Sequence, residues 1–404
     1  MSLLLCNAVP WGAAAPADVT VESGRITGIG GPAPAGAELV DLSGCVLLPG
    51  FVDAHCHLDK TLWGGPWVPN PAGSRLADKI AYTRAGRAEH GVPSVDRIAA
   101  LLERMAAAGT TRVRTHTDVS PEFGLDGVHA VRAAAERLAD RITVQQVIFP
   151  QYGLLTNTGT AELMEQALRI GAAQVVGGID PAGVDRDPVR HLDVVFGLAT
   201  TWDVPIDLHL HDRDTLGAWE FELIIERTLA TGMQHRVTIG HGFALGDVAA
   251  DRQGELIVGL AEAGIALATC AAHNDPLLPL DRLRAAGVTV AAGSDGIRDL
   301  WSPYGDGDML RRAHRLAERM SYCADFEIES ALTAATFGGA QALRLEDYGL
   351  RPGARADLVA VPARTVAEAV VSCPPRRMVL RAGQFQPDIA TAPGSDAVPG
   401  AAAP

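Results

Sequence analysis

Short apolar runs rich in β-branched residues alternate with helical patterns from residue 46 to about residue 345. This alternation predicts strand–helix units around a parallel sheet. Eight units over about 300 residues favour a closed (β/α)8 barrel of the α/β class over an open doubly wound sheet, since no G-x-G-x-x-G motif follows the first strand. The expected strands are Val46–Asp53, Arg112–Val119, Ile142–Phe149, Gln174–Asp180, Pro205–His211, Val237–His241, Ile265–Cys270 and Val288–Ser294.

Both ends of the chain carry strand patterns outside this alternation. The N-terminal part contains an expected hairpin that turns at Ser23–Gly24, and two further strand patterns lie near the C-terminus. Pairing of these strands would bring the two chain ends together in one small domain. The predicted domains are a β-sandwich from residues 1–48 and 347–386, a barrel over residues 49–346, and a disordered tail over residues 387–404.

The composition is that of a soluble globular protein, with 48% hydrophobic and 20% charged residues among 404. A net charge of −14 argues against nucleic acid or an anionic membrane as a partner, because binding a polyanion needs a basic surface. A small neutral or cationic substrate remains compatible. The six cysteines form no C-x-x-C pair and the first basic residue is Arg25, so we expect a cytoplasmic protein with reduced thiols and no secretory leader. A homo-oligomer is also expected.

Histidines and an aspartate stand where several predicted strands end. The stretch VLLPGFVDAHCHLDK, which begins at residue 46, carries His55 and His57, and strand alternation sends both side chains to the same side. The fifth, sixth and eighth strands end near His209, His241 and Asp295. Because the carboxyl ends of barrel strands share one mouth, these five side chains predict a divalent metal site. The alternative is a set of satisfied structural histidines.

This constellation resembles the amidohydrolase superfamily. The segment PGFVDAHCHLDK is similar to the opening strand of that family's barrels. The segments RTHTDVS (114–120), FPQYG (149–153) and SDGIRDLWSPYGDGDM (294–309) narrow the resemblance to the cytosine deaminase branch. The segment GGIDPA (177–182) is similar to the members of that branch that hydrolyse N-isopropylammelide. The resemblance covers nearly the whole chain and implies a metal-dependent hydrolase on a (β/α)8 barrel.

A single metal ion is expected. Two-metal members of the superfamily commonly bridge their ions with a carboxylated lysine after the fourth strand, and this chain has only Lys60 and Lys79, neither of which lies there. His and Asp ligands suit several metals, so the expected cofactor is one Zn2+ or Fe2+ per chain. The resemblance places His241 near the metal-bound water rather than on the metal. The implied ligands are His55, His57, His209 and Asp295.

The resemblance also implies catalytic roles. A metal-bound hydroxide would attack an amino-bearing ring carbon, while Asp295 would accept a proton and His241 would orient the water or polarise the substrate. Cytosine deaminase uses a glutamate after its fifth strand as the proton shuttle, whereas this chain has Asp212 at that offset and His211 before it. The expected shuttle is therefore Asp212, His211 or both.

Substrate contacts are expected around the same mouth. Gln151 matches the glutamine that hydrogen-bonds the pyrimidine amide edge in cytosine deaminase, which favours a lactam-like heterocycle. His116 either lines the pocket or is structural, and His191, on a predicted helix, is expected to be solvated. The expected substrate contacts are Gln151, Lys60, Asp180 and Trp301, of which Trp301 would stack on a ring or else pack in the core.

These expectations predict a mononuclear metal-dependent hydrolase of a non-peptide C–N bond. It would act as an aminohydrolase that deaminates a small nitrogen heterocycle, such as a cytosine-like pyrimidine or an aminotriazine. One alternative is an N-alkyl amidohydrolase that releases an alkylamine from an N-substituted aminotriazine such as N-isopropylammelide. Two others are a metal-free barrel that only binds a heterocycle and a two-metal cyclic-amide hydrolase.

Overall fold

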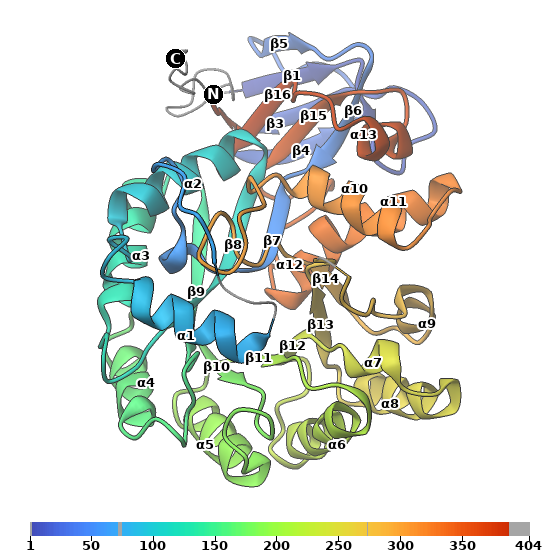
Figure 1. Ribbon diagram of the computed structural model, residues 1–404. Coiled ribbons are helices and arrows are strands. Elements are labelled where there is room, and N and C mark those ends of the chain that lie inside the picture. The colour runs from blue at the N-terminus through green and yellow to red at the C-terminus, as the bar shows by residue number, and fades with distance from the viewer. Residues whose placement is uncertain (1, 72–74, 273, 388–404) are drawn as a thin grey trace, which may run out of the picture.

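The computed structural model describes residues 2–71, 75–272 and 274–387, so all but the first residue of the predicted tail lies outside the described residues. It confirms the predicted barrel: eight strands pair in chain order in one parallel sheet, with helices around the outside (Figure 1). The strands are β7 (Phe51–Cys56), β8 (Thr110–Asp118), β9 (Thr143–Phe149), β10 (Val175–Ile179), β11 (Ile206–Leu210), β12 (Val237–His241), β13 (Ala266–Thr269) and β14 (Val290–Ala292).

The barrel closes between β14 and β7 at the carboxyl ends of both strands. There the backbone N–H of Asp295 donates a 2.8 Å hydrogen bond to the carbonyl oxygen of His55, and Asp295 pairs in parallel with Cys56. Two of the predicted metal ligands therefore lie on the closing seam, where the backbone hydrogen bonds fix their relative position.

Several of the helices cover the barrel because they turn an apolar face to the sheet. Helix α2 is an example: the Ser94 side chain accepts a hydrogen bond from the Arg97 N–H at its start, and Leu101 and Met105 are buried. None of the helices in the described part of the chain is both long and apolar enough to cross a bilayer. The helices are η1 (Leu58–Lys60), α1 (Leu76–Gly86), α2 (Val95–Ala107), α3 (Asp126–Arg137), α4 (Thr160–Arg169), α5 (Pro188–Thr201), α6 (Asp214–Ala230), α7 (Ala244–Asp247), α8 (Ala250–Glu262), α9 (Leu280–Ala285), α10 (Met309–Arg319), α11 (Asp325–Thr333), the π-helical η2 (Ala334–Gly338), α12 (Gly339–Ala342) and α13 (Val366–Ser372).

The remaining strands form a small separate domain from both chain ends, seen beyond one side of the barrel in Figure 1. Its two sheets have the orders β4-β3-β1-β5 and β17-β16-β15-β6-β2, and the predicted hairpin at Ser23–Gly24 joins β3 to β4. Apolar side chains from both sheets, including Leu5, Val21, Leu47 and Leu358, pack into one buried cluster. The strands are β1 (Ser2–Cys6), β2 (Val9–Pro10), β3 (Val19–Glu22), β4 (Arg25–Ile29), β5 (Glu38–Asp41), β6 (Cys45–Pro49), β15 (Leu358–Pro362), β16 (Met378–Arg381) and β17 (Gln384–Phe385).

The prediction of one opening strand over Val46–Asp53 is wrong. The run is divided between β6, which pairs with β15 in the small domain, and β7, which pairs with β8 in the barrel. The strands part at Gly50, whose N–H donates to the carbonyl oxygen of Asp357, while the Phe51 N–H donates to that of Gly109. The apolar run hides this break, because both strands are fully buried and neither shows alternation.

Candidate metal centre and active site

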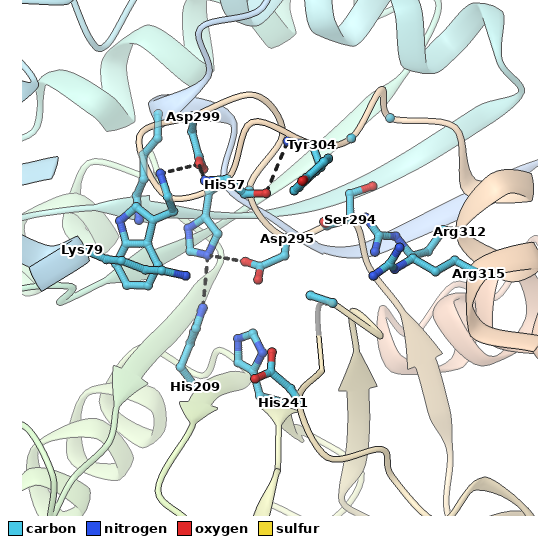
Figure 2. Close-up of a pocket in the computed structure, with 18 of the residues that line it drawn as sticks. His57, Lys79, His209, His241, Ser294, Asp295, Asp299, Tyr304, Arg312 and Arg315 are labelled. Carbon is cyan, nitrogen blue, oxygen red and sulfur yellow. Dashed lines mark hydrogen bonds and ion pairs between the residues drawn. The ribbon is translucent and has the colours of Figure 1, made fainter. Parts of the chain in front are cut away.

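The five predicted metal-binding side chains meet at the carboxyl end of the barrel, and Figure 2 shows several of them around Asp295. Nε2 of His57 lies 3.4 Å from Oδ1 of Asp295 and 3.2 Å from Nε2 of His209. Nε2 of His55 lies 3.9 Å from the same Asp295 oxygen. His55, His209 and His241 each offer one ring nitrogen, and these three nitrogens lie within 4.8 Å of one another. Such spacings are those of donor atoms arranged around a single ion.

The backbone is strained at the strand ends that supply these groups. Asp180, His241 and Asp295 have φ values of 33°, 67° and 61°, in the left-handed region that non-glycine residues rarely adopt. His241 ends β12, Asp180 directly follows β10, and Asp295 stands three residues after the end of β14. Strain of this kind costs on the order of 1–3 kcal/mol per residue and gathers at functional sites. Other residues of the chain share this conformation, so it supports the site only together with the convergence of the ligand groups.

Two glycines make room for His55. A β-carbon at Gly240, on β12, would lie 2.8 Å from Cε1 of the His55 ring. A β-carbon at Gly293, directly after β14, would lie 2.4 Å from the carbonyl oxygen of His55. Side chains at either position would displace the ring or the strand, so the small residues on the neighbouring strands are part of what positions this ligand.

The imidazoles are poised as neutral ligands. Both ring nitrogens of His55, Nδ1 of His209 and Nε2 of His241 are buried without a hydrogen-bond partner among the described residues. Nδ1 of His57 lies 3.2 Å from the carbonyl oxygen of His116, which leaves Nε2 for the centre. Burial lowers the pKa of all four rings, that of His57 to about 4 and that of His241 to about 3. Neutral imidazoles with free nitrogens fit a divalent metal.

Two carboxylates flank the closing seam and do different work. Asp295 supplies the carboxylate of the centre, with Oδ1 3.4 Å from Nε2 of His57 and 3.9 Å from Nε2 of His55. Asp53 is fully buried, and its Oδ1 accepts the backbone N–H groups of Ser294 at 3.0 Å and His55 at 3.3 Å. Asp53 therefore holds the two ligand-bearing strand ends together. The sequence analysis missed it, although its place two residues before His55 is a usable signal.

His211 and Asp180 form a pair beside the centre. The ring of His211 stacks on that of His241 with centroids 4.2 Å apart, and its Nδ1 lies 2.8 Å from Oδ2 of Asp180. Burial alone lowers the pKa of His211, but the charge and hydrogen bond of Asp180 raise it above the ordinary value. His211 lines the cavity, whereas Asp180, expected to contact the substrate, lies behind His211 and outside the lining.

Asp212 is turned away from the cavity. Its carboxylate accepts the backbone N–H of Gly183 at 2.8 Å and is hydrogen-bonded to Glu220, which is fully buried and accepts the N–H of Ala182 at 2.7 Å. Burial, together with the neighbouring Asp212 charge, raises the pKa of Glu220 to about 9, so the two carboxyls share a proton at neutral pH. Of the two expected shuttles, the geometry therefore favours His211.

Three of the expected substrate contacts line a cavity of about 630 Å3 over the metal centre, namely Lys60, Gln151 and Trp301. Nζ of Lys60 donates to Oε1 of Gln151 at 2.6 Å and pairs with Asp118 at 2.9 Å. It also lies 5.6 Å from the Trp301 ring centroid. The indole N–H of Trp301 is buried without a partner among the described residues, so it is free to donate to a ligand.

Several lining residues escaped the sequence analysis. Asp299 accepts the backbone N–H groups of Trp301 and Ser302, both at 2.8 Å, and thereby shapes the segment after β14. Its position in the SDGIRD segment is a signal that was available. The others come from helices and loops, where no strand-end pattern marks them: Lys79 from α1, Phe243 from the segment before α7, and Arg312 and Arg315 from α10.

Two other histidines lie outside the cavity lining. Both ring nitrogens of His116 are buried without a hydrogen-bond partner among the described residues, and His116 groups with His55 and Asp207 as possible metal ligands. His116 is buried below the centre, with Nε2 3.2 Å from Oδ1 of Asp207 and its ring centroid 4.2 Å from that of His55. The expectation that His191 is solvated is wrong: His191 is fully buried on the face of α5 turned toward the sheet, with Nδ1 2.7 Å from Asp185. A helical position alone does not show which face of the helix a residue occupies.

Comparison with known proteins decides the family. The model of the amidohydrolase family matches residues 75–385, which is more than half of the chain. The chain belongs to the amidohydrolase family. This amidohydrolase is therefore a hydrolase of C–N bonds other than peptide bonds, as the sequence predicted.

Its relatives include enzymes of the predicted branch. N-isopropylammelide isopropyl amidohydrolase of Pseudomonas sp. (strain ADP) is 31% identical over 357 residues, which cover 86% of this chain and 87% of the relative. The crystal structure of N-isopropylammelide isopropylaminohydrolase from Burkholderia multivorans ATCC 17616 is 43% identical with a TM-score of 0.91, covering 95% of this chain and 98% of that one. The crystal structure of 5-methylcytosine deaminase from Klebsiella pneumoniae, liganded with 5-fluorocytosine, is 26% identical with a TM-score of 0.85. The match covers 96% of this chain and 97% of that one. The predicted resemblance is confirmed.

Proposed function

We propose that this amidohydrolase uses one divalent metal ion to hydrolyse a non-peptide C–N bond of a small nitrogen heterocycle and releases ammonia. The observation that carries the proposal is the convergence of neutral, unpartnered imidazole nitrogens and one carboxylate at the strained mouth of the barrel. The residues that would hold the ion are His55, His57, His209 and Asp295.

A bound divalent ion supplies one thing to this reaction: it lowers the pKa of water from 15.7 to about 7 and so provides a nucleophile at neutral pH. The surroundings support one ion rather than two. Lys60 is engaged with Asp118 and Gln151, and Lys79 lies on α1, so neither lysine is placed to bridge a second ion. Zinc and iron(II) both suit the donor set.

The chain's own residues would bind the ring and move protons. The Oε1 atom of Gln151 is taken by Lys60, so its amide N–H2 remains to donate to a ring carbonyl, while the face of Trp301 offers a stacking surface. The free Nε2 of His241 orients the attacking water. His211 carries a proton to the leaving nitrogen, and Asp180 at its Nδ1 fixes the ring and stabilises its charged form.

A second candidate differs only in the leaving group. Loss of an alkylamine from an N-substituted aminotriazine needs the same metal centre but more room beside the reacting carbon. The cavity of about 630 Å3 exceeds the volume of a single ring, and the two N-isopropylammelide hydrolases are 31% and 43% identical to this chain. These observations favour the alkylamine reaction as the alternative to deamination.

A product assay separates the two candidates. The metal-loaded enzyme is incubated with cytosine, 5-substituted cytosines, isocytosine, aminotriazines and N-isopropylammelide, and ammonia and alkylamine are quantified. Ammonia from an aminopyrimidine or aminotriazine supports deamination, and alkylamine alone supports the N-dealkylating reaction. The matched control is Asp295→Ala, which removes a metal ligand and is expected to abolish either product. Activity that survives in this variant would refute the proposed metal centre.

A further inference from the structure

Helix α10 presents two arginines to the cavity beside the metal centre. Arg312 and Arg315 line the wall next to Ser294, and Figure 2 shows them across the cavity from Lys79. They lie three residues apart on one helix, so their guanidinium groups emerge from the same face.

Neither arginine is neutralised by a carboxylate. Arg312 donates to the carbonyl oxygens of Cys270 at 2.5 Å and Ser294 at 2.9 Å, and Nε of Arg315 donates to that of Ala271 at 3.0 Å. In the described part of the chain, neither guanidinium lies within ion-pair distance of an Asp or Glu, and the exposed Arg315 makes its hydrogen bond through Nε alone, so its two Nη groups are open to solvent and to a ligand. The wall therefore carries positive charge and unused planar donors.

A third arginine adds to this charge. Arg319, one turn further along α10, donates to the carbonyl oxygens of Ala272 and Asp275, both at 2.7 Å. Burial lowers its pKa, and repulsion by the Arg315 charge lowers it further, against a smaller opposing effect of the Asp275 carboxylate. The three arginines therefore gather positive charge along this face of α10.

Three further carboxylates line this side of the cavity, and Asp275 is the one for which no ion pair is found among the described residues. The other two are already used. Asp306 pairs with Arg104 at 3.2 Å. Asp308 pairs with Arg376 and caps the start of α10 by accepting the Leu310 N–H at 3.0 Å. Asp306 and Asp308 are therefore engaged elsewhere, and neither pairs with Arg312 or Arg315 in the described part of the chain.

We propose that Arg315, supported by Arg312, binds an anionic substituent, such as a carboxylate, on the heterocyclic substrate. The inference rests on the proposed function, because the reacting ring carbon must lie at the metal centre while the substituent points to α10. A guanidinium with two free Nη groups matches a carboxylate by paired hydrogen bonds. The net charge of −14 made a neutral or cationic substrate compatible with the sequence, and this local cationic wall selects an anionic one instead.

Binding measurements test the inference without turnover. Uracil and its 5-carboxy and 6-carboxy derivatives, which carry no amino group to lose, are titrated calorimetrically into the metal-loaded enzyme. We expect at least one carboxylated ring to bind tenfold or more tightly than uracil, which corresponds to about 1.4 kcal/mol. In Arg315→Gln the ratio of the affinity for the carboxylated ring to that for uracil should fall to about one. The matched control is Arg132→Gln, an exposed helical arginine that pairs only with Glu136 and should keep the wild-type ratio.

The outcomes separate this inference from the proposed function. Equal affinities, no binding of any of the three rings, or an unchanged ratio in Arg315→Gln would each overturn the anion site. Ammonia release from a neutral aminoheterocycle, measured separately, would leave the proposed function standing in that event. An Arg315-dependent preference without C–N hydrolysis of any amino counterpart would instead retain the anion site and remove the deaminase.

Discussion

Two histidine–aspartate pairs with buried carboxylates look alike in this molecule, but their histidines face different surroundings. Nδ1 of His211 lies 2.8 Å from Asp180, and Nδ1 of His191 lies 2.7 Å from Asp185. Both aspartates follow β10, five residues apart. By residue type, distance and burial of the carboxylate, neither pair stands out as the functional one.

The second ring nitrogen separates the pairs. His211 lines the cavity and stacks on His241, so its Nε2 side faces the place where a substrate would lie. His191 turns Nε2 into the barrel wall, where a β-carbon at Gly178 would lie only 2.6 Å from it. Asp185 also accepts the N–H groups of Leu154 and Thr156, which ties two loops together. We therefore expect only the His211–Asp180 pair to act in catalysis, because the second ring nitrogen of His211 is the one on the cavity side.

Replacing His211 should give the largest difference between the pairs. In His211→Ala we expect kcat to fall by about 10²–10⁴-fold, because the group that carries the proton to the leaving nitrogen is gone. Metal content should stay at the wild-type level. Steady-state kinetics on the substrate found by the product assay measure the loss, and His191→Ala, normalised to folded enzyme, is the control. An equal loss of kcat in His211→Ala and His191→Ala would contradict the distinction between the two pairs.

Replacing Asp180 should have a smaller effect on the same step. In Asp180→Asn we expect kcat to fall by roughly 10–100-fold, because the ring of His211 keeps its position but loses the charge that stabilises its protonated form. KM should change little, since Asp180 does not line the cavity. A rise in KM at unchanged kcat would show that Asp180 binds the substrate directly after all.

Loss of the His191 ring should affect folding rather than catalysis. His191→Ala removes the Nδ1 partner of Asp185 inside the wall, and we expect the free energy of unfolding to fall by about 2 kcal/mol. Chemical denaturation measures the change, with His211→Ala as the comparison variant, for which we expect less than about 1 kcal/mol because its ring borders the cavity. The reverse order would contradict the structural reading of His191.

The Glu220–Asp212 carboxyl pair next to Asp180 predicts a pH effect on stability. The folded pKa of Glu220 is raised to about 9, so its contribution is full below its unfolded pKa and is lost as pH rises toward 9. Glu220→Gln mimics the protonated form and removes this loss. Each unit of pKa shift is worth about 1.4 kcal/mol, so we expect the stability of the variant relative to wild type to rise by several kcal/mol between pH 5 and pH 8–9. Thermal unfolding of both proteins across this pH range measures the difference. The same pH dependence of stability in wild type and variant would contradict a proton shared between Glu220 and Asp212.

The barrel and most of its predicted metal ligands could be predicted from the sequence, because the ends of the strands can be read from it. His55, His209 and Asp295 each stand where an apolar run stops, and the barrel brings such positions to one mouth. The break at Gly50 was hidden because β6 and β7 are both buried and read as one run. His211 and Asp212 are adjacent, and only the turn after β11 decides which of them faces the cavity.

Cavity residues that lie on helices could not be predicted from the pattern of polar residues at strand ends. Arg312 and Arg315 lie about 17 and 20 residues after Asp295, and their approach to the cavity depends on how the segment after β14 folds back. Asp299 and the cap at Asp308 direct that path through backbone hydrogen bonds that no periodicity encodes. Loop geometry, rather than residue type, sets what surrounds the metal centre.

The number of metal ions per chain tests the central claim most directly. Elemental analysis of the natively purified enzyme should give one zinc or iron per chain, and Asp295→Ala, which removes a predicted ligand but leaves the barrel strands intact, should give close to none. Two ions per chain would contradict the mononuclear centre. A native content near zero, with unchanged folding, would contradict a metal-dependent hydrolase altogether.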